Sequence, residues 1–123
     1  MTNDELLDLV NEKDEVVGTV WKSKAHLDPS KIHREVTIAV FNKNGEVLIQ
    51  QRSMNKANDP GVWKITAAGH VKSGEKPTRA IEREVYEELG FRVHPKYSQK
   101  IFSKYKNKES RFREELSYNF VIR

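Results

Sequence analysis

The sequence predicts a single α+β domain over residues 1–123, and three observations support this prediction. Short runs rich in apolar and β-branched residues recur between polar turn signals, a pattern typical of strands. One segment, residues 77–89, instead repeats apolar residues at helical spacing between a proline and a glycine. No repeat, linker or low-complexity tract divides the chain, which is long enough to fold as one domain.

Strands are expected on both sides of this helix, each bounded by polar residues. The predicted strands are Leu6–Val10, Val16–Trp21, Val36–Phe41, Glu46–Gln51, Val62–Ala68, Phe91–Val93, Gln99–Tyr105 and Arg111–Ile122. Loops or turns are expected at residues 11–14, 22–33, 42–45, 52–61 and 106–110. The signal at residues 42–45, Asn-Lys-Asn-Gly, favours a hairpin between its two neighbouring strands.

The central helix has clear signals at both ends. Pro77 suits the first helical position, where a missing N–H costs nothing. Gly90 suits the left-handed residue that ends a helix. At about 100° per residue, Ile81, Val85 and Leu89 form one apolar stripe that should face a sheet.

Three carboxylates share one turn of this helix. Glu84 and Glu88 lie beside the apolar stripe, and Glu87 lies further round. Like charges three or four residues apart repel, and only Glu87 has a basic residue, Arg83, one turn before it. A hard divalent cation such as Mg²⁺ or Mn²⁺ would relieve this repulsion. The alternative is a solvated acidic helix face, and the spacing alone does not separate the two.

Residues 69–91 fit the pattern G-x5-E-x7-R-E-U-x-E-E-x-G-U, where U is aliphatic or aromatic. The fixed positions are Gly69, Glu75, Arg83, Glu84, Val85, Glu87, Glu88, Gly90 and Phe91. The segment therefore resembles the box of the Nudix family at every fixed position. The resemblance implies a hydrolase that uses Mg²⁺ or Mn²⁺ to cleave a small molecule in which a nucleoside diphosphate is linked to another group.

The same resemblance assigns roles to the box residues. The implied metal ligands are Glu84, Glu87, Glu88 and the carbonyl oxygen of Gly69. Arg83 and Glu75 would brace the loop against the helix, and Glu84 is a candidate catalytic base. Some relatives place that base outside the box, so Glu114 or Glu115 is the alternative.

The resemblance also implies the fold: a mixed sheet packed between helices in an α/β/α sandwich. Here the chain stops in an apolar run, residues 119–123, where related domains continue into a C-terminal helix. We therefore expect one sheet face to expose apolar side chains, and a homodimer that covers it.

Residues 5–70 are similar to the Nudix proteins related to isopentenyl diphosphate isomerase. The motifs that carry this likeness are Asp14-Glu15-Val16-Val17-Gly18, Ala25-His26, Ile32-His33-Arg34, Gln51-Arg52, Pro60-Gly61-Val62-Trp63 and Ala68-Gly69-His70. In the isomerases, histidines at the places of His26, His33 and His70 bind metal, and three imidazoles suit Zn²⁺ or Mn²⁺. Their scattered spacing here favours three ordinary loop or strand-end histidines instead.

One position separates hydrolysis from isomerisation. The isomerases have a catalytic cysteine immediately before the Gly-His pair, whereas this chain has Ala68 there and no cysteine anywhere. Isomerases also tend to lack the full set of box residues, which this chain has. Hydrolysis is therefore favoured, with an isomerase-like enzyme or a non-catalytic nucleotide-sensing module as alternatives.

The candidate phosphate-binding residues are basic and lie before the box. Arg34 and Arg52 offer guanidinium forks, and Lys56 offers a point charge, although a solvated surface lysine is an equal alternative. Residues 96–123 hold eight basic and three acidic residues among aromatics, but no recognised nucleic-acid motif, so nucleic acid is not favoured as a partner.

The composition bears on the chemistry and the cellular location of the protein. The net charge is +4, and without cysteine neither disulfides nor thiolate chemistry are available. No segment has the length or apolarity of a signal peptide or membrane span. The sequence therefore predicts a cytoplasmic protein that does not bind membranes.

Overall fold

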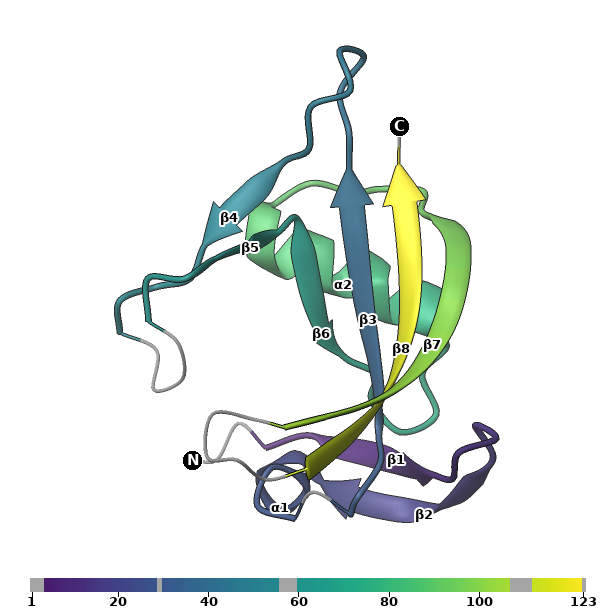
Figure 1. Cartoon of the computed structure of the whole chain (residues 1–123). Coiled ribbons are helices and arrows are strands. Elements are labelled where there is room, and N and C mark those ends of the chain that lie inside the picture. Colours follow the sequence, from purple (N-terminus) through teal and green to yellow (C-terminus); the bar gives the residue numbers. More distant parts are fainter. Residues whose placement is uncertain (1–3, 29, 56–59, 107–111, 123) are drawn as a thin grey trace.

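The computed structural model describes residues 4–28, 30–55, 60–106 and 112–122 (Figure 1). For residues 104–106 and 112–115 it describes the backbone alone. Its elements alternate short strands with two helices. In chain order they are β1 Leu6–Val10, β2 Val16–Trp21, α1 Lys22–Ala25, β3 Arg34–Val40, β4 Ile49–Gln51, β5 Trp63–Ile65, β6 Ala67–His70, α2 Pro77–Leu89, β7 Lys96–Lys106 and β8 Phe112–Ile122. No helix in these residues is long and apolar enough to cross a membrane.

A four-stranded mixed sheet forms the centre of the fold. Its order is β6-β3-β8-β7, with β3 and β8 parallel and the outer pairs antiparallel. Helix α2 lies across one face of this sheet (Figure 1). The predicted α+β architecture, a mixed sheet with one main helix packed on it, is therefore confirmed.

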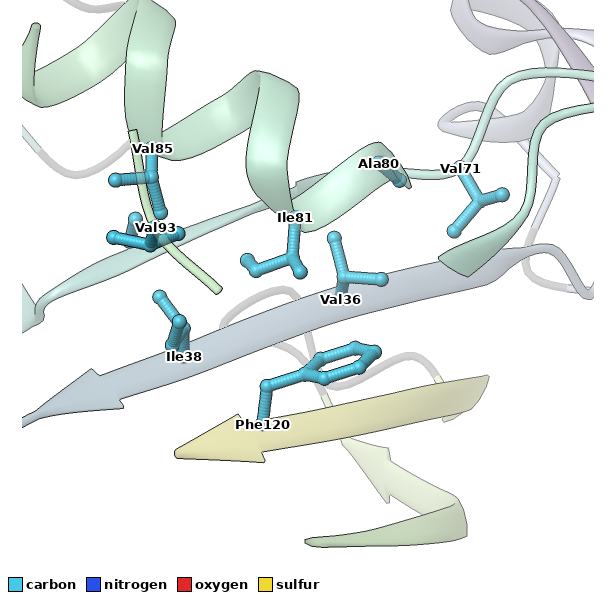
Figure 2. Close-up of a cluster of buried hydrophobic side chains, with 9 residues drawn as sticks. Val36, Ile38, Val71, Ala80, Ile81, Val85, Val93 and Phe120 are labelled. Carbon is cyan, nitrogen blue, oxygen red and sulfur yellow. The ribbon is translucent and has the colours of Figure 1, made fainter. Parts of the chain in front are cut away.

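The core lies between α2 and this sheet. Val36 and Ile38 of β3 and Phe120 of β8 meet the helical Ile81 and Val85, as Figure 2 shows. All five side chains are buried. Helix α2 begins at Pro77 and ends at Gly90, which has a φ of 80°, so both predicted ends are confirmed.

Strands β1 and β2 form a separate hairpin below this sheet, in the predicted places (Figure 1). Residues 22–33, predicted as a loop, instead begin with the short helix α1. The reason is a cap from far along the chain, because Asp4 accepts hydrogen bonds from the Ser23 amide (3.0 Å) and hydroxyl (2.6 Å). A local sequence pattern cannot predict a cap of this kind, because its two residues lie far apart in the sequence.

The turn at residues 42–45 forms as predicted, with Gly45 at a φ of 78°. The hairpin that should follow it does not continue, because β4 leaves β3 and pairs with β5. The predicted strand Val62–Ala68 accordingly divides at Thr66 into β5 and β6. The buried Thr66 hydroxyl fixes this break, because it donates to the Leu48 carbonyl (2.5 Å) and accepts from the Val40 amide (3.0 Å).

Residues 91–93, predicted as a strand, form no regular element. Val93 is instead buried as part of the core beneath α2. The next strand, β7, starts at Lys96, just after Pro95, which has no amide hydrogen to donate to a ladder. The predicted turn at residues 106–110 lies mostly outside the described residues.

The sheet face opposite α2 carries both polar and apolar side chains. Thr37 and Ala39 alternate with the core residues of β3 and so point away from α2. Their cross-strand neighbours include Ala68 and Asn119, and Thr37 donates a 2.6 Å hydrogen bond to Asn119. Polar side chains thus share this part of the face with the partly exposed apolar pair of Ala39 and Val121, so the expectation of an exposed apolar surface there stays a prediction. Homodimer formation stays a prediction.

Candidate functional site

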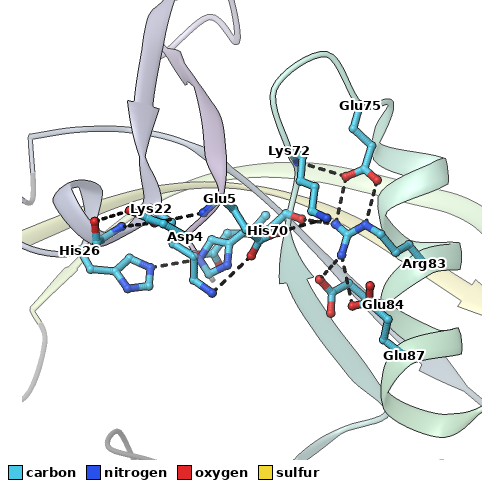
Figure 3. A network of polar contacts seen from close by, with 12 residues as sticks. Asp4, Glu5, Lys22, His26, His70, Lys72, Glu75, Arg83, Glu84 and Glu87 are labelled. Atoms are coloured by element: carbon cyan, nitrogen blue, oxygen red, sulfur yellow. Dashed lines mark hydrogen bonds and ion pairs between the residues drawn. The ribbon is translucent and has the colours of Figure 1, made fainter. Parts of the chain in front are cut away.

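Arg83, in the middle of α2, is the centre of a polar network that reaches the loop before the helix (Figure 3). Its guanidinium donates to both carboxylate oxygens of Glu75 (2.9 and 3.0 Å) and to the His70 carbonyl (3.0 Å). It also donates to Glu84 (2.8 Å) and Glu87 (3.4 Å). The predicted contact between Arg83 and Glu75 is present, and it ties the loop before α2 to the helix.

The charges in this network stabilise one another. Burial alone would raise the pKa of Glu75, but hydrogen bonds from Arg83 and from the Lys72 amide outweigh it and lower that pKa. The bonds to Glu75 raise the pKa of Arg83 above its already high value. Glu75 is thus ionised and Arg83 protonated at neutral pH, so the brace is a charge-assisted, bidentate pair.

Glu84 lies directly against Gly69 of β6. A β-carbon at position 69 would overlap the Glu84 carboxylate and would come within 2.6 Å of its Cγ. Burial raises the pKa of Glu84, the bond from Arg83 opposes this, and the charges of Glu88 and Glu87 raise it further. A half-buried carboxylate beside two other acids gains from any added positive charge, whether a proton or a cation.

The carboxylate of Glu88 contacts two residues of the β4–β5 pair. Gln50 donates to its Oε2 (2.8 Å), and the ammonium of Lys64 lies 3.6 Å from its Oε1. The sequence places no basic residue one turn before Glu84 or Glu88. Basic partners nevertheless reach both carboxylates in the structure. Arg83 pairs with the first and Lys64 with the second, and the second pairing spans a long sequence separation.

This arrangement fits a hard divalent cation in two respects. Its donors are carboxylate oxygens from one helical turn, the ligand type that Mg²⁺ and Mn²⁺ prefer. The missing side chain at Gly69 leaves the space that the Glu84 carboxylate fills. Whether the Gly69 carbonyl and the three carboxylates share one ion stays a prediction.

Three histidines form a second candidate metal site. His26 follows α1, His33 precedes β3, and His70 ends β6. One ligand atom from each lies within 4.8 Å of the others, and the Nε2 atoms of His26 and His70 are 3.2 Å apart. The three histidines therefore lie together despite their scattered spacing, and metal binding by them stays a prediction.

The chemistry of this cluster also suits a metal. Burial, followed by the charges of His33 and Lys22, lowers the pKa of His70 to about 3. His70 is therefore a neutral imidazole at neutral pH, the form that ligates metal. The residues come from three separate elements, so no fixed spacing along the sequence could reveal them.

The predicted phosphate-binding residues differ in their surroundings. Arg34 donates from Nε to Asp14 Oδ1 (2.6 Å) and from Nη2 to the Asp14 carbonyl (3.0 Å), so two of its five N–H donors are already engaged. Arg52 opens the loop after β4, where its amide donates to the Val62 carbonyl (2.8 Å). Lys56 lies outside the described residues, as do the side chains of Glu114 and Glu115.

Comparison with solved structures finds the same fold elsewhere. DR0079 from Deinococcus radiodurans is 29% identical, with a TM-score of 0.67 over 97% of this chain and 73% of that protein. The MutT protein of Methanosarcina mazei, at 23% identity, has a TM-score of 0.59 over 73% of this chain and 62% of its own.

Comparison with curated sequences points to two kinds of relative. The isopentenyl-diphosphate Delta-isomerase of Streptomyces coelicolor is 44% identical over 85 residues, 69% of this chain and 43% of that enzyme. The uncharacterized Nudix hydrolase lmo0368 of Listeria monocytogenes is 38% identical over 86 residues, 70% of this chain and 51% of its own. The chain thus spans about half the length of these relatives. The NUDIX domain family model matches residues 31–123, so the chain belongs to the Nudix family.

Proposed function

We propose that the chain is a hydrolase that uses Mg²⁺ or Mn²⁺ to cleave the diphosphate linkage of a nucleoside diphosphate derivative. The observation that supports it most is the half-buried carboxylate of Glu84. It lies against Gly69, is held by Arg83, and stands on the same helical turn as Glu87 and Glu88.

Each residue of this turn has a role in the proposal. A divalent cation bound there would neutralise phosphate oxygens and lower the pKa of bound water. Glu84, Glu87 and Glu88 would hold the cation, and Arg83 fixes the orientation of Glu84 through its 2.8 Å bond. Glu84, on the same helical turn, would accept a proton from attacking water. Glu114 or Glu115 is the alternative base.

The histidine cluster favours a second candidate, an isomerase-like enzyme. Relatives that resemble this chain are named isopentenyl-diphosphate Delta-isomerases, and three convergent imidazoles could hold a Zn²⁺ or Mn²⁺ ion. Moving a double bond requires an acid and a base on either side of the reacting carbons. Ala68 has no ionisable group at the position of the isomerase cysteine, so we rank this function second.

A substrate screen tests both candidates. The purified chain is incubated with Mg²⁺ or Mn²⁺ and nucleotide sugars, dinucleotide polyphosphates, coenzymes or nucleoside triphosphates, and the phosphorylated products are separated and identified. Labelled isopentenyl diphosphate is incubated in parallel and its products are separated. Hydrolysis of a diphosphate linkage without formation of the dimethylallyl isomer is the expected result. Isomer formation would reverse the ranking, and binding without turnover would favour a nucleotide-sensing module.

A further inference from the structure

The short β4–β5 pair has a polar face and an apolar face. Gln50 and Lys64 are direct cross-strand partners, so their side chains point to the same side of the pair. That side is turned toward Glu88 of α2. On the other face Ile49, Trp63 and Ile65 are exposed. The polar face is therefore the side that meets the box helix.

Gln50 and Lys64 contact different oxygens of the Glu88 carboxylate. The Gln50 amide nitrogen donates to Oε2 (2.8 Å) and also to the Thr66 carbonyl (2.7 Å), so both of its hydrogens are used. The Thr66 backbone is in turn fixed by its buried hydroxyl. Gln50 is thus a rigid support for one carboxylate oxygen.

Lys64 holds the other oxygen more loosely. Its ammonium lies 3.6 Å from Oε1, and its side chain is 28% exposed. A lysine has a flexible four-carbon stem and a strongly hydrated head group, so it can move into solvent at little cost. The two contacts therefore differ in kind: a fixed hydrogen bond on Oε2 and an exchangeable cation on Oε1.

We infer that Lys64 is an internal counter-ion that a divalent cation displaces from Glu88, while Gln50 keeps the carboxylate oriented. The inference rests on the proposed function, in which Glu88 is a metal ligand. A dication and an ammonium repel each other at contact distance, so a dication bound at Oε1 disfavours the Lys64 contact there. Lys64 is accordingly a positioning residue that sets how tightly the box binds metal.

Calorimetric titration with Mg²⁺ tests this inference. Imidazoles are poor ligands for Mg²⁺, so the histidine cluster should not contribute to the measured heat. Lys64→Met removes the charge and keeps the stem, Lys64→Arg keeps the charge, and Lys43→Met removes an exposed charge from the remote turn. We expect Lys64→Met to bind Mg²⁺ about two- to fivefold more tightly than wild type, the range that exposed ion pairs support. The gain should shrink at high salt. Lys64→Arg should bind no more tightly than wild type, and Lys43→Met should match it.

Glu88→Gln in the same titration separates two kinds of failure. If Glu88→Gln weakens Mg²⁺ binding but Lys64→Met does not tighten it beyond Lys43→Met, the counter-ion role is wrong and the metal site stands. If Glu88→Gln binds Mg²⁺ as wild type does, the metal role of Glu88 in the proposed function fails, and this inference fails with it. Circular dichroism of each variant confirms that the fold is intact.

Discussion

The carboxylate of Glu84 rests against the α-carbon of Gly69, so the box helix and strand β6 meet where one of them has no side chain. Arg83 adds a second link between the same elements by donating to the His70 carbonyl. Together these contacts place the end of β6 beside the acidic turn of α2. The candidate site is thus built at the junction of a strand and a helix.

Gly69→Ala should lower both the stability of the fold and its affinity for metal. The new β-carbon overlaps the Glu84 carboxylate, which must leave its place, and overpacking of this kind costs about 1–3 kcal/mol. We expect Mg²⁺ affinity to fall by more than about tenfold, because a box ligand is misplaced. Gly18→Ala is the matched control, since its β-carbon would meet only Leu9 at 3.8 Å. Equal Mg²⁺ affinity of Gly69→Ala and wild type would contradict the role of this contact.

Asp14 should contribute stability that depends on pH. Burial would raise its pKa, but hydrogen bonds from Tyr118, Arg34 and Lys100 outweigh this and lower it below 3.8. The contribution of a carboxylate with a lowered pKa is present above the unfolded-state pKa and is lost as pH falls through the folded-state value.

Asp14→Asn measures this contribution without backbone strain. Asp14 has a φ of 64°, a conformation that asparagine also tolerates. At pH 7 we expect the free energy of unfolding of the variant to be about 1.5–3 kcal/mol lower than that of wild type, the range for hydrogen bonds to charged groups. Urea titrations at decreasing pH should show the difference shrinking below pH 3.8. A difference that stays constant down to that range would refute the assignment.

The histidine cluster should bind one transition-metal ion independently of the acidic turn. We expect Co²⁺ to give visible absorption bands with wild type, and His70→Ala to abolish them, because two imidazoles hold the ion far less tightly than three. His94→Ala, which removes the exposed histidine outside the cluster, should leave the bands unchanged. Retention of the bands in His70→Ala would show that the three rings do not form the site.

The elements that local signals specify were the ones predicted correctly. Pro77 and Gly90 mark the ends of α2, and the strand pattern of Leu6–Val10 needs no distant partner. The division of the strand at Thr66 depends on a hydroxyl that reaches β3 and the segment before β4. Its cause is a long-range contact, so a local pattern could not show it.

The candidate site follows the same rule. The contact between Arg83 and Glu75 follows from the box pattern, because both residues are in it. Lys64 and Gln50 reach Glu88 only because β4 pairs with β5, where the sequence predicted a hairpin with β3. The histidine cluster likewise requires α1, β3 and β6 to converge, and this is a property of the tertiary fold.

Turnover of Glu88→Gln tests the central claim most directly. It is measured with Mg²⁺ on whichever diphosphate substrate the screen identifies, beside Glu82→Gln, which changes a glutamate of the same helix that pairs with Arg79 instead. We predict that Glu88→Gln lowers kcat at least about a hundredfold, about 3 kcal/mol of transition-state stabilisation, with the fold intact. Glu82→Gln should keep wild-type turnover. Equal turnover of the two variants would contradict a hydrolase whose metal is held by the acidic turn of α2.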